Sequence, residues 1–300
     1  MALKNMQIPF LKYKKIYFAF SGVLILASIL SLIVFGLNLG IDFKGGSILE
    51  VEYQTERPSN QTIKDNLADF DLGLSYVQPA GERGVILRTK DLTEEVHQQV
   101  LEKLKETGDF EERRFESIGP VVGQELKEKT KVIIILALLA IVLYIAFAFR
   151  KIQRPLGSWQ YGIASLLALF HDILIPLGVF SVLGKFYQVE ISIPVITALL
   201  AVLGYSINNT VVVFDRIREN LIKRRDGFEE TVDQSLNQTL TRSINTSLTT
   251  LFVLFAIFFF GGETLRYFSL ALILGISMGT YSSIFLASPI LVVWLKRKER

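Results

Sequence analysis

The sequence predicts a multi-pass α-helical membrane protein with six transmembrane helices and a small α+β domain between the first and second helix. Mean hydropathy is +0.40 although 20% of the 300 residues are charged, so apolar residues must be concentrated in long uncharged runs. Residues 37–130 hold 12 Lys and Arg against 19 Asp and Glu, whereas the rest of the chain holds 20 against 10. We therefore expect an acidic domain outside the bilayer and a membrane part with basic edges.

The six predicted helices follow from length and composition. A bilayer core about 30 Å thick needs roughly 20 apolar helical residues. The segments that meet this requirement are 16–36, 131–149, 158–183, 190–214, 241–262 and 265–295. The fifth is the least apolar, because its uncharged run, Ser243 to Gly262, barely spans a bilayer and a full crossing includes polar residues near Arg242.

Basic residues in the short flanking segments predict the orientation, since Lys and Arg are enriched on the cytoplasmic side. Four clusters occur: Lys4, Lys12, Lys14 and Lys15; Arg150, Lys151 and Arg154; Arg216, Arg218, Lys223, Arg224 and Arg225; and Lys296, Arg297, Lys298 and Arg300. With six helices all four clusters fall on one side. Segments 1–15, 215–240 and 296–300 are then cytoplasmic and 37–130 is external. A nucleic-acid partner is not predicted, because no groove-reading motif accompanies these clusters.

The 37–130 interval alternates strand and helix patterns. Strands are expected at 47–53, 73–78, 85–89 and 111–117, and helices at 59–70 and 92–107. The order βαββαβ predicts a ferredoxin-like domain. His97 lies between acidic and Gln residues on the second helix, so we expect a solvated surface histidine rather than a metal ligand.

Residue usage argues against an enzyme. The chain has no cysteine and two histidines, which excludes disulfides, thiolate zinc sites, iron–sulfur ligation and a cysteine nucleophile. Neither the external interval nor the spans contain a nucleophile with a base or a Gly-rich phosphate loop. We expect no catalytic residues, no metal and no cofactor.

Ionisable residues inside a bilayer are costly and are therefore candidates for function. Asp172, beside His171, falls halfway along the third span. A structural hydrogen bond and a proton relay both remain open for this carboxyl group.

The fourth and fifth spans predict a polar seam. The fourth carries Tyr205, Ser206, Asn208, Asn209 and Thr210 before Asp215. In the fifth, Arg242 shares one helical face with Asn245, Thr246, Thr249 and Thr250. Arg242 either extends to the headgroups or lies in the seam. If it is buried, its counter-ion comes from Asp172, Asp215 or another chain.

The sixth span carries small residues at every fourth position: Ala271, Gly275, Gly279, Ser283 and Ala287. Small residues let two membrane helices approach closely, so this stripe predicts helix packing rather than a ligand groove.

Three motifs occur in order along the chain: Gly40-Ile-Asp42-Phe43-Lys-Gly45-Gly46, the run from Gly204 to Asn220, and Thr239-Leu-Thr-Arg242-Ser243. Together with the six spans and one large external loop, they resemble the SecF-type members of the SecD/SecF family of protein-export membrane proteins. The resemblance covers nearly the whole chain.

This resemblance implies half of a transporter of the resistance-nodulation-division (RND) type in the bacterial inner membrane. Its partners would be a SecD-like chain, the SecYEG channel, a YajC-like accessory protein, exported polypeptides and membrane lipid. A proton or sodium gradient would drive it. The family's arginine falls on Arg242, whereas its aspartate falls on position 209, where this chain has Asn. Asn cannot titrate, so a SecD-like acid acts alone, the ion differs, or this chain is an altered form.

The glycines that flank the external domain suggest a mechanical role. Gly40, Gly45 and Gly46 on one side, and Gly119, Pro120 and Gly123 on the other, predict a hinge. We hypothesise that ion binding in the seam tilts the domain at 47–117. The alternatives are an RND-type exporter of small molecules or lipids, and a structural scaffold subunit.

Overall fold

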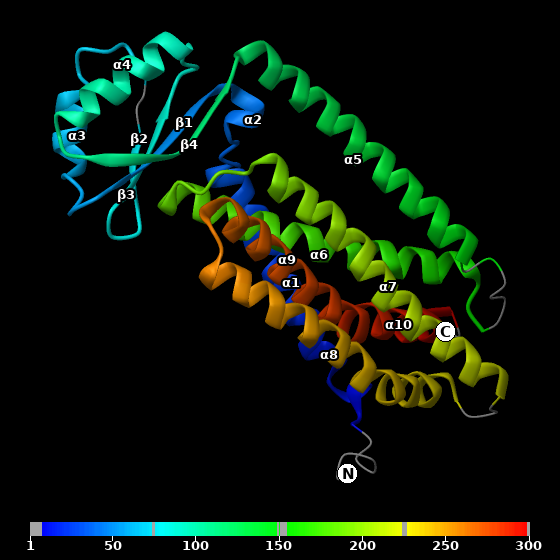
Figure 1. Cartoon of the computed structure of the whole chain (residues 1–300). Coiled ribbons are helices and arrows are strands. Elements are labelled where there is room, and N and C mark those ends of the chain that lie inside the picture. The colour runs from blue at the N-terminus through cyan, green and yellow to red at the C-terminus, as the bar shows by residue number, and fades with distance from the viewer. Residues whose placement is uncertain (1–7, 74–75, 149, 151–154, 224–226, 299–300) are drawn as a thin grey trace. The chain divides into compact units, whose positions relative to one another are not determined.

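The computed structural model describes residues 8–73, 76–148, 150, 155–223 and 227–298 (Figure 1). The chain divides into two compact units: a membrane unit of Met1–Asn38 and Ile134–Arg300, and an insert of Leu39–Ile133. Six helices in the described part are long and apolar enough to cross a membrane, which confirms the predicted number. Seven residues of the predicted clusters and spans lie outside the described residues: Lys4, Phe149, Lys151, Arg154, Arg224, Arg225 and Arg300.

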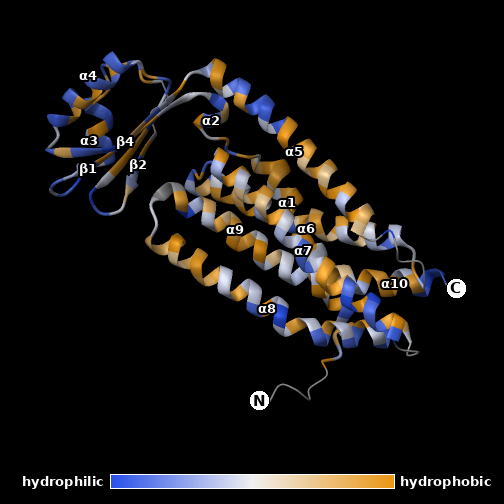
Figure 2. Ribbon diagram, turned by 45° about the vertical axis from the view of Figure 1, so that its right-hand side comes forward, coloured by the Kyte–Doolittle hydropathy of each residue, from blue (hydrophilic) through white to orange (hydrophobic). Residues whose placement is uncertain are grey.

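The helices of the spans are longer than the apolar runs that predicted them. They are α1 (Lys14–Phe35, preceded by the 3-10 turn η1, Phe10–Tyr13), α5 (Pro120–Ala148), α6 (Ser158–Tyr187), α7 (Ile193–Lys223), α8 (Phe228–Phe260) and α9 (Glu263–Ser282). The last span continues through a π-helical turn, η2 (Ser283–Ala287), into α10 (Ser288–Lys298). Figure 2 shows apolar residues along these helices, with more polar stretches on α7 and α8.

The segment 215–240, expected as a connection between spans, is mostly helical. It forms the end of α7 and the beginning of α8. The physical reason is an apolar stripe on each side of the turn, because Ile217 on α7 and Val232 and Leu236 on α8 are fully buried. Because both stripes are buried, α7 and α8 remain helical beyond their apolar runs.

The centre of the membrane unit is formed by α6, α7 and the last span. About half of each apolar window is buried in these three spans (56, 50 and 56%), against 17, 6 and 17% for α1, α5 and α8. Gly275 and Gly279 of α9 lie directly against Val202 and Ser206 of α7. A Cβ at Gly275 would lie 2.3 Å from a γ-methyl of Val202, so only glycine permits this approach.

The insert has the predicted βαββαβ order. After the short helix α2 (Ile41–Lys44), its elements are β1 (Gly46–Tyr53), α3 (Asn60–Asn66), β2 (Tyr76–Ala80), β3 (Gly84–Thr89), α4 (Glu94–Lys105) and β4 (Phe110–Ile118). The four strands pair antiparallel in the order β2-β3-β1-β4. Both helices begin at a side-chain cap, where Ser59 accepts from the Thr62 N–H and Thr93 from the Val96 N–H.

The core of the insert lies between one face of the sheet and the two helices. Alternate residues of β1, namely Leu49, Val51 and Tyr53, are buried. They pack with Ile63 of α3 and Leu104 of α4, among others. The alternation that predicted the strand therefore corresponds to one buried face.

The expectation of a solvated His97 is wrong. Its ring is 3% exposed and stacks on Phe115 of β4, with the ring centroids 3.6 Å apart. Its Nδ1 lies 3.4 Å from Glu94 Oε1 and its Nε2 lies 3.3 Å from Glu112 Oε1. The reason is the helical phase, because His97 shares the buried face of α4 with Val100 and Leu104, whereas its charged sequence neighbours lie on the other face.

Candidate functional site

A fully buried carboxylate lies in the middle of the membrane unit. Asp172 and its neighbour His171 on α6 have no exposed surface. Ser206 Oγ of α7 donates a hydrogen bond to Asp172 Oδ2 at 2.5 Å, and Ser282 Oγ of α9 donates to the same oxygen at 2.7 Å. His171 Nδ1 lies 2.8 Å from Asp172 Oδ1. Three spans therefore meet at one acidic side chain.

The backbone of the last span is irregular next to this carboxylate. Ser282 directly precedes the π-helical turn η2, and Ser288, which directly follows it, donates through Oγ to the carbonyl oxygen of Ser283 at 3.0 Å. Single π-helical turns inside α-helices occur frequently at functional sites. The small side chains of Ser283 and Ala287 let this turn remain buried, and Ser283 Oγ donates to the carbonyl oxygen of Thr280 at 3.0 Å.

Two buried polar atoms near the carboxylate lack a hydrogen-bond partner among the described residues. They are His171 Nε2 and Thr210 Oγ1, the latter one helical turn after Ser206. A buried carboxylate with hydroxyl groups around it can exchange a proton or bind a small cation through oxygen atoms. Within the described ranges, no group of three or more His, Cys, Asp or Glu residues is placed to hold a metal ion.

A second polar cluster joins α7, α8 and α9. Tyr205 Oη donates to Ser247 Oγ at 3.2 Å, and Ser247 Oγ lies 2.6 Å from Thr280 Oγ1. Asn209 is 4% exposed, and its Nδ2 lies 3.5 Å from Thr280 Oγ1. Within the predicted spans, the polar contact between α7 and α8 is made by Ser247, which the sequence analysis missed. The available signal was the series of hydroxyl residues at four-residue spacing, Thr239, Ser243 and Ser247, all of which are buried.

Arg242 lies on the exposed side of α8, together with Asn245. It forms no ion pair or hydrogen bond with any residue in the described part of the chain. The two acids that sequence analysis offered as counter-ions are engaged elsewhere. Asp172 is held by Ser206 and Ser282, and Asp215 lies 3.6 Å from Arg218 with 70% of its side chain exposed.

Exposed polar residues continue along both helices. On α8 they are Arg242, Asn245, Thr246 and Thr249, which we call the exposed polar face of α8; Thr250 is half-buried. On α7, Asn208 is exposed, and a Cβ at Gly204 would meet open space. Polar side chains on a membrane-spanning helix are costly when they face lipid.

The Gly-rich motif of the insert is tightly packed. Asp42 and the buried Phe43 form part of α2. Gly45 and Gly46 have φ values of 79° and 133°, which favour glycine. A Cβ at Gly45 would lie 2.8 Å from Pro120 Cα, and one at Gly46 would lie 2.7 Å from the Thr89 carbonyl oxygen. The motif therefore fastens the two ends of the insert to each other.

Comparison with known proteins places these features in a family. The family model "Protein export membrane protein SecD/SecF, C-terminal" matches residues 98–297, and the "SecD/SecF GG Motif" model matches residues 30–56. The protein translocase subunit SecF of Thermobaculum terrenum is 42% identical over 96% of this chain and 94% of its own length. That of Vibrio alginolyticus is also 42% identical, over 94% of this chain and 88% of its own length.

Solved structures agree. The crystal structure of SecDF, a translocon-associated membrane protein from Thermus thermophilus, matches with a TM-score of 0.83 and 34% identity. The match covers all of this chain but only 40% of that longer chain. These similarities favour a translocase subunit over the small-molecule exporter and the scaffold. The chain belongs to the SecD/SecF family of protein-export membrane proteins, as a translocase subunit of the SecF type.

Proposed function

We propose that this subunit works with a SecD-like chain beside the Sec translocon in the bacterial inner membrane and uses an ion gradient to promote protein export. The observation that carries the ion-coupling role is the buried carboxylate of Asp172, which three polar side chains from three spans surround. The basic clusters support an orientation in which segments 1–15, 215–240 and 296–300 are cytoplasmic and the insert is outside.

Energetics supports a coupling role for Asp172. A buried charge is expensive to keep unless it is paired or has a function. One elementary charge that moves across 100 mV releases about 2.3 kcal/mol, which changes a two-state equilibrium by roughly fiftyfold. Protonation of Asp172, or cation binding to it, changes its hydrogen bonds to Ser206 and Ser282, and so acts on α7 and α9 together.

The SecD-like chain supplies an acidic counter-ion for Arg242. The exposed polar face of α8 has no cover from the described part of this chain, and Arg242 has no acid there. A carboxylate of the SecD-like chain against this face provides the counter-ion. Asn209 is uncharged and contacts Thr280, so in this proposal the ion-coupling residue of the chain is Asp172 rather than position 209.

The insert is the mechanical part of the proposal. Movement of the spans reaches it through its two ends, which Gly45 and Pro120 hold together. Tilting of the domain at 47–117 would draw an exported polypeptide outward. Its four-stranded sheet and two helices form a compact unit, which suits movement as a single body.

Ion flux tests the proposal. The subunit is purified with its SecD-like partner, reconstituted in liposomes, and exposed to a proton gradient or a sodium gradient. Asp172→Asn is expected to abolish flux of the coupling ion and to reduce export of a secreted reporter protein. Asp215→Asn is the matched control, because that carboxyl group is largely exposed at the end of a span, and it should leave flux unchanged.

The outcomes separate the possibilities. Undiminished flux in Asp172→Asn overturns the role of Asp172. If ion flux appears only in the Asn209→Asp variant, position 209 carries the ion in this family and the unmodified chain does not conduct it. The gradient that gives flux in the unmodified complex identifies the ion.

A further inference from the structure

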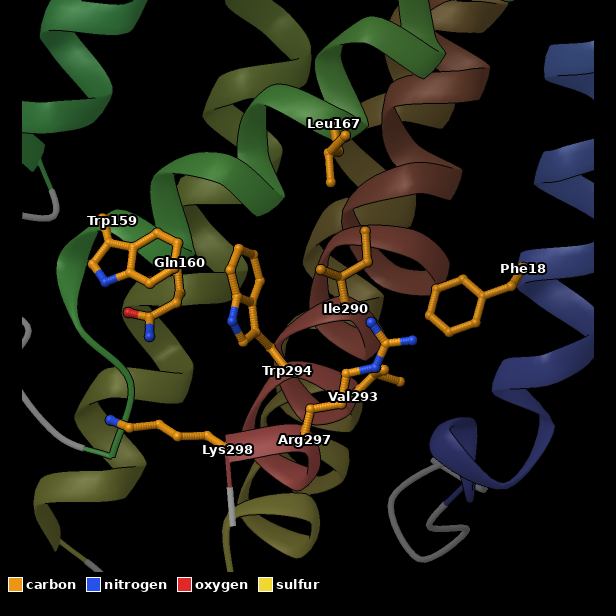
Figure 3. A pocket seen from close by; sticks show the side chains of 9 residues that line it. All are labelled: Phe18, Trp159, Gln160, Leu167, Ile290, Val293, Trp294, Arg297 and Lys298. Atoms are coloured by element: carbon orange, nitrogen blue, oxygen red, sulfur yellow. The ribbon is translucent and has the colours of Figure 1, made fainter. Parts of the chain in front are cut away.

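A groove outside the ion-coupling site lies at the end of the membrane unit where α10 ends. It has a volume of about 700 Å³ and lies between α1, α6 and α10 (Figure 3). Its walls are mainly apolar, with Phe18 from α1, Leu167 from α6, and Ile290 and Val293 from α10. A groove of this size and lining accommodates part of an acyl chain.

Both tryptophans of the chain line this groove. Trp159 and Trp294 meet edge to face with ring centroids 4.8 Å apart, and Trp159 is 59% exposed. Tryptophan side chains concentrate at the level of the lipid headgroups, because the ring is apolar and its N–H is polar. The groove therefore lies at a membrane surface rather than at the bilayer centre.

The mouth of the groove is cationic. Arg297 and Lys298 line it and are exposed, and no acidic residue is among the lining residues. Neither forms an ion pair with a residue that the structure describes, whereas the adjacent Lys296 is paired with Glu229. Figure 3 shows Lys298 extending beneath Gln160 and Arg297 reaching toward Phe18. Two cations at the polar end of an apolar groove match a phosphate attached to acyl chains.

One polar side chain of the groove is buried and incompletely bonded. Gln160 is 3% exposed, and its Oε1 has no hydrogen-bond partner among the described residues. An amide oxygen needs a donor, and leaving it unbonded in a buried position is unfavourable. A headgroup hydroxyl satisfies this requirement, whereas a bare phosphate monoester or an N-methylated headgroup supplies a poorer donor.

We propose that this groove is a binding site for an anionic phospholipid with a hydroxylated headgroup, of the phosphatidylglycerol class. The phosphate lies between Arg297 and Lys298, a headgroup hydroxyl donates to Gln160 Oε1, and an acyl chain lies along Leu167 and Ile290. The lipid thereby holds α10 against α1 and α6.

The two tryptophans provide the assay, since both lie at the groove and the chain has no others. The full chain is placed in phosphatidylcholine nanodiscs that contain increasing amounts of phosphatidylglycerol brominated on its acyl chains, and tryptophan fluorescence is measured. Brominated phosphatidylcholine at equal bromine content is the reference. We expect saturable quenching by the anionic lipid at mole fractions at least tenfold lower than by the reference lipid. Equal quenching by both lipids would overturn the proposal.

Two double variants distinguish specific lipid binding in the groove from nonspecific attraction by surface charge. Arg297→Gln with Lys298→Gln should weaken the preference for the anionic lipid about twenty-five-fold, at roughly fivefold for each basic residue. Lys12→Gln with Lys15→Gln removes two exposed cations that do not line the groove and should have little effect. An equal loss in both double variants would reduce the effect to nonspecific attraction and refute the site.

The headgroup is tested separately. Gln160→Leu should remove the preference for phosphatidylglycerol over phosphatidic acid and retain the preference for both over phosphatidylcholine. Glycerol phosphate without acyl chains should not reverse the quenching. Reversal would show that the groove binds a soluble phosphate ester and would overturn the assignment to lipid.

Discussion

Gly275 lies where α7 and α9 approach each other, and its substitution tests the packing that brings Ser206 and Ser282 to Asp172. A Cβ at this position would lie 2.3 and 2.5 Å from the two γ-methyls of Val202 and 2.9 Å from its Cβ. Non-bonded carbon atoms are most stable at about 3.5–4.0 Å, so the helices must separate by roughly 1 Å. Val202 is fully buried, and a β-branched side chain in a helix keeps one rotamer, so it cannot turn away.

The expected free-energy change combines two opposing effects. Overpacking of a core costs about 1–3 kcal/mol. The higher helix propensity of alanine offsets up to about 1 kcal/mol of this. Gly275→Ala should therefore lower the free energy of unfolding by about 1–2 kcal/mol. Gly22→Ala on α1 is the matched control, because a Cβ there would meet nothing within 4 Å, and it should be neutral or slightly stabilising.

Unfolding in dodecyl maltoside micelles with increasing dodecyl sulfate, followed by far-ultraviolet circular dichroism, measures these differences. Val202→Ala removes both γ-methyls that face Gly275 and should itself cost about 1–2 kcal/mol. The double variant, Gly275→Ala with Val202→Ala, should have a free energy of unfolding at least about 1 kcal/mol higher than the sum of the two single effects predicts. Additive effects, or a Gly275→Ala variant as stable as the unmodified chain, would refute the close-packing argument.

Three further predictions concern other parts of the molecule. Arg242→Glu should reduce co-purification with the SecD-like chain at least tenfold without changing the melting temperature of the isolated subunit; an unchanged yield contradicts the proposed interface. Burial raises the pKa of Tyr53 above its ordinary value of 10.0, although the hydrogen bond with Thr107 opposes this shift. The folded insert therefore holds this proton more tightly than the unfolded chain. The contribution of the Tyr53 hydroxyl to the free energy of unfolding is therefore intact below about pH 10 and is lost as the pH rises further. In thermal melts, the melting temperature of Tyr53→Phe should fall less between neutral and alkaline pH than that of the unmodified chain. Ser59→Ala removes the cap that accepts from the Thr62 N–H at 3.0 Å and should destabilise the insert by about 1 kcal/mol in urea titrations, whereas Ser59→Gly should cost only a few tenths.

The order of the elements could be predicted from the sequence because it depends on local pattern. Long uncharged runs determine the spans, and two-residue alternation determines β1, where Leu49, Val51 and Tyr53 are buried. Which polar face of a membrane helix packs inside the subunit could not be predicted. The spacing showed that Arg242 and Asn245 share one face of α8, but the face that packs inside the subunit carries Ser243 and Ser247. Lipid is as apolar as leucine, so hydrophobicity does not tell which face of a membrane helix is buried.

One hydrogen-bond partner of Asp172, Ser282, was missed for a geometric reason. A four-residue repeat placed Ser283 in line with Gly279, whereas the residue that donates to Asp172 is Ser282. Ser282 precedes the π-helical turn at 283–287 and lies three residues after Gly279, a spacing that also shares one helical face, so a search for every fourth residue alone does not include it. The acid itself was identifiable from its position in an apolar run, but its hydrogen-bond partners depend on how three spans pack.

The two faces of α7 explain how an event at Asp172 can reach another chain. Ser206 on the inner face donates to Asp172 and lies against Gly279, where a Cβ would lie 3.0 Å from the Ser206 Cβ. Asn208, two residues later, is exposed on the outer face. Because α7 is packed this closely on its inner face, a shift of that face also moves the outer face. In the proposed mechanism, ion binding at Asp172 would change its contact with Ser206, and α7 would carry that change to the surface where we place the SecD-like chain. This route requires no charge at Asn209, which is why a neutral residue there is compatible with coupling.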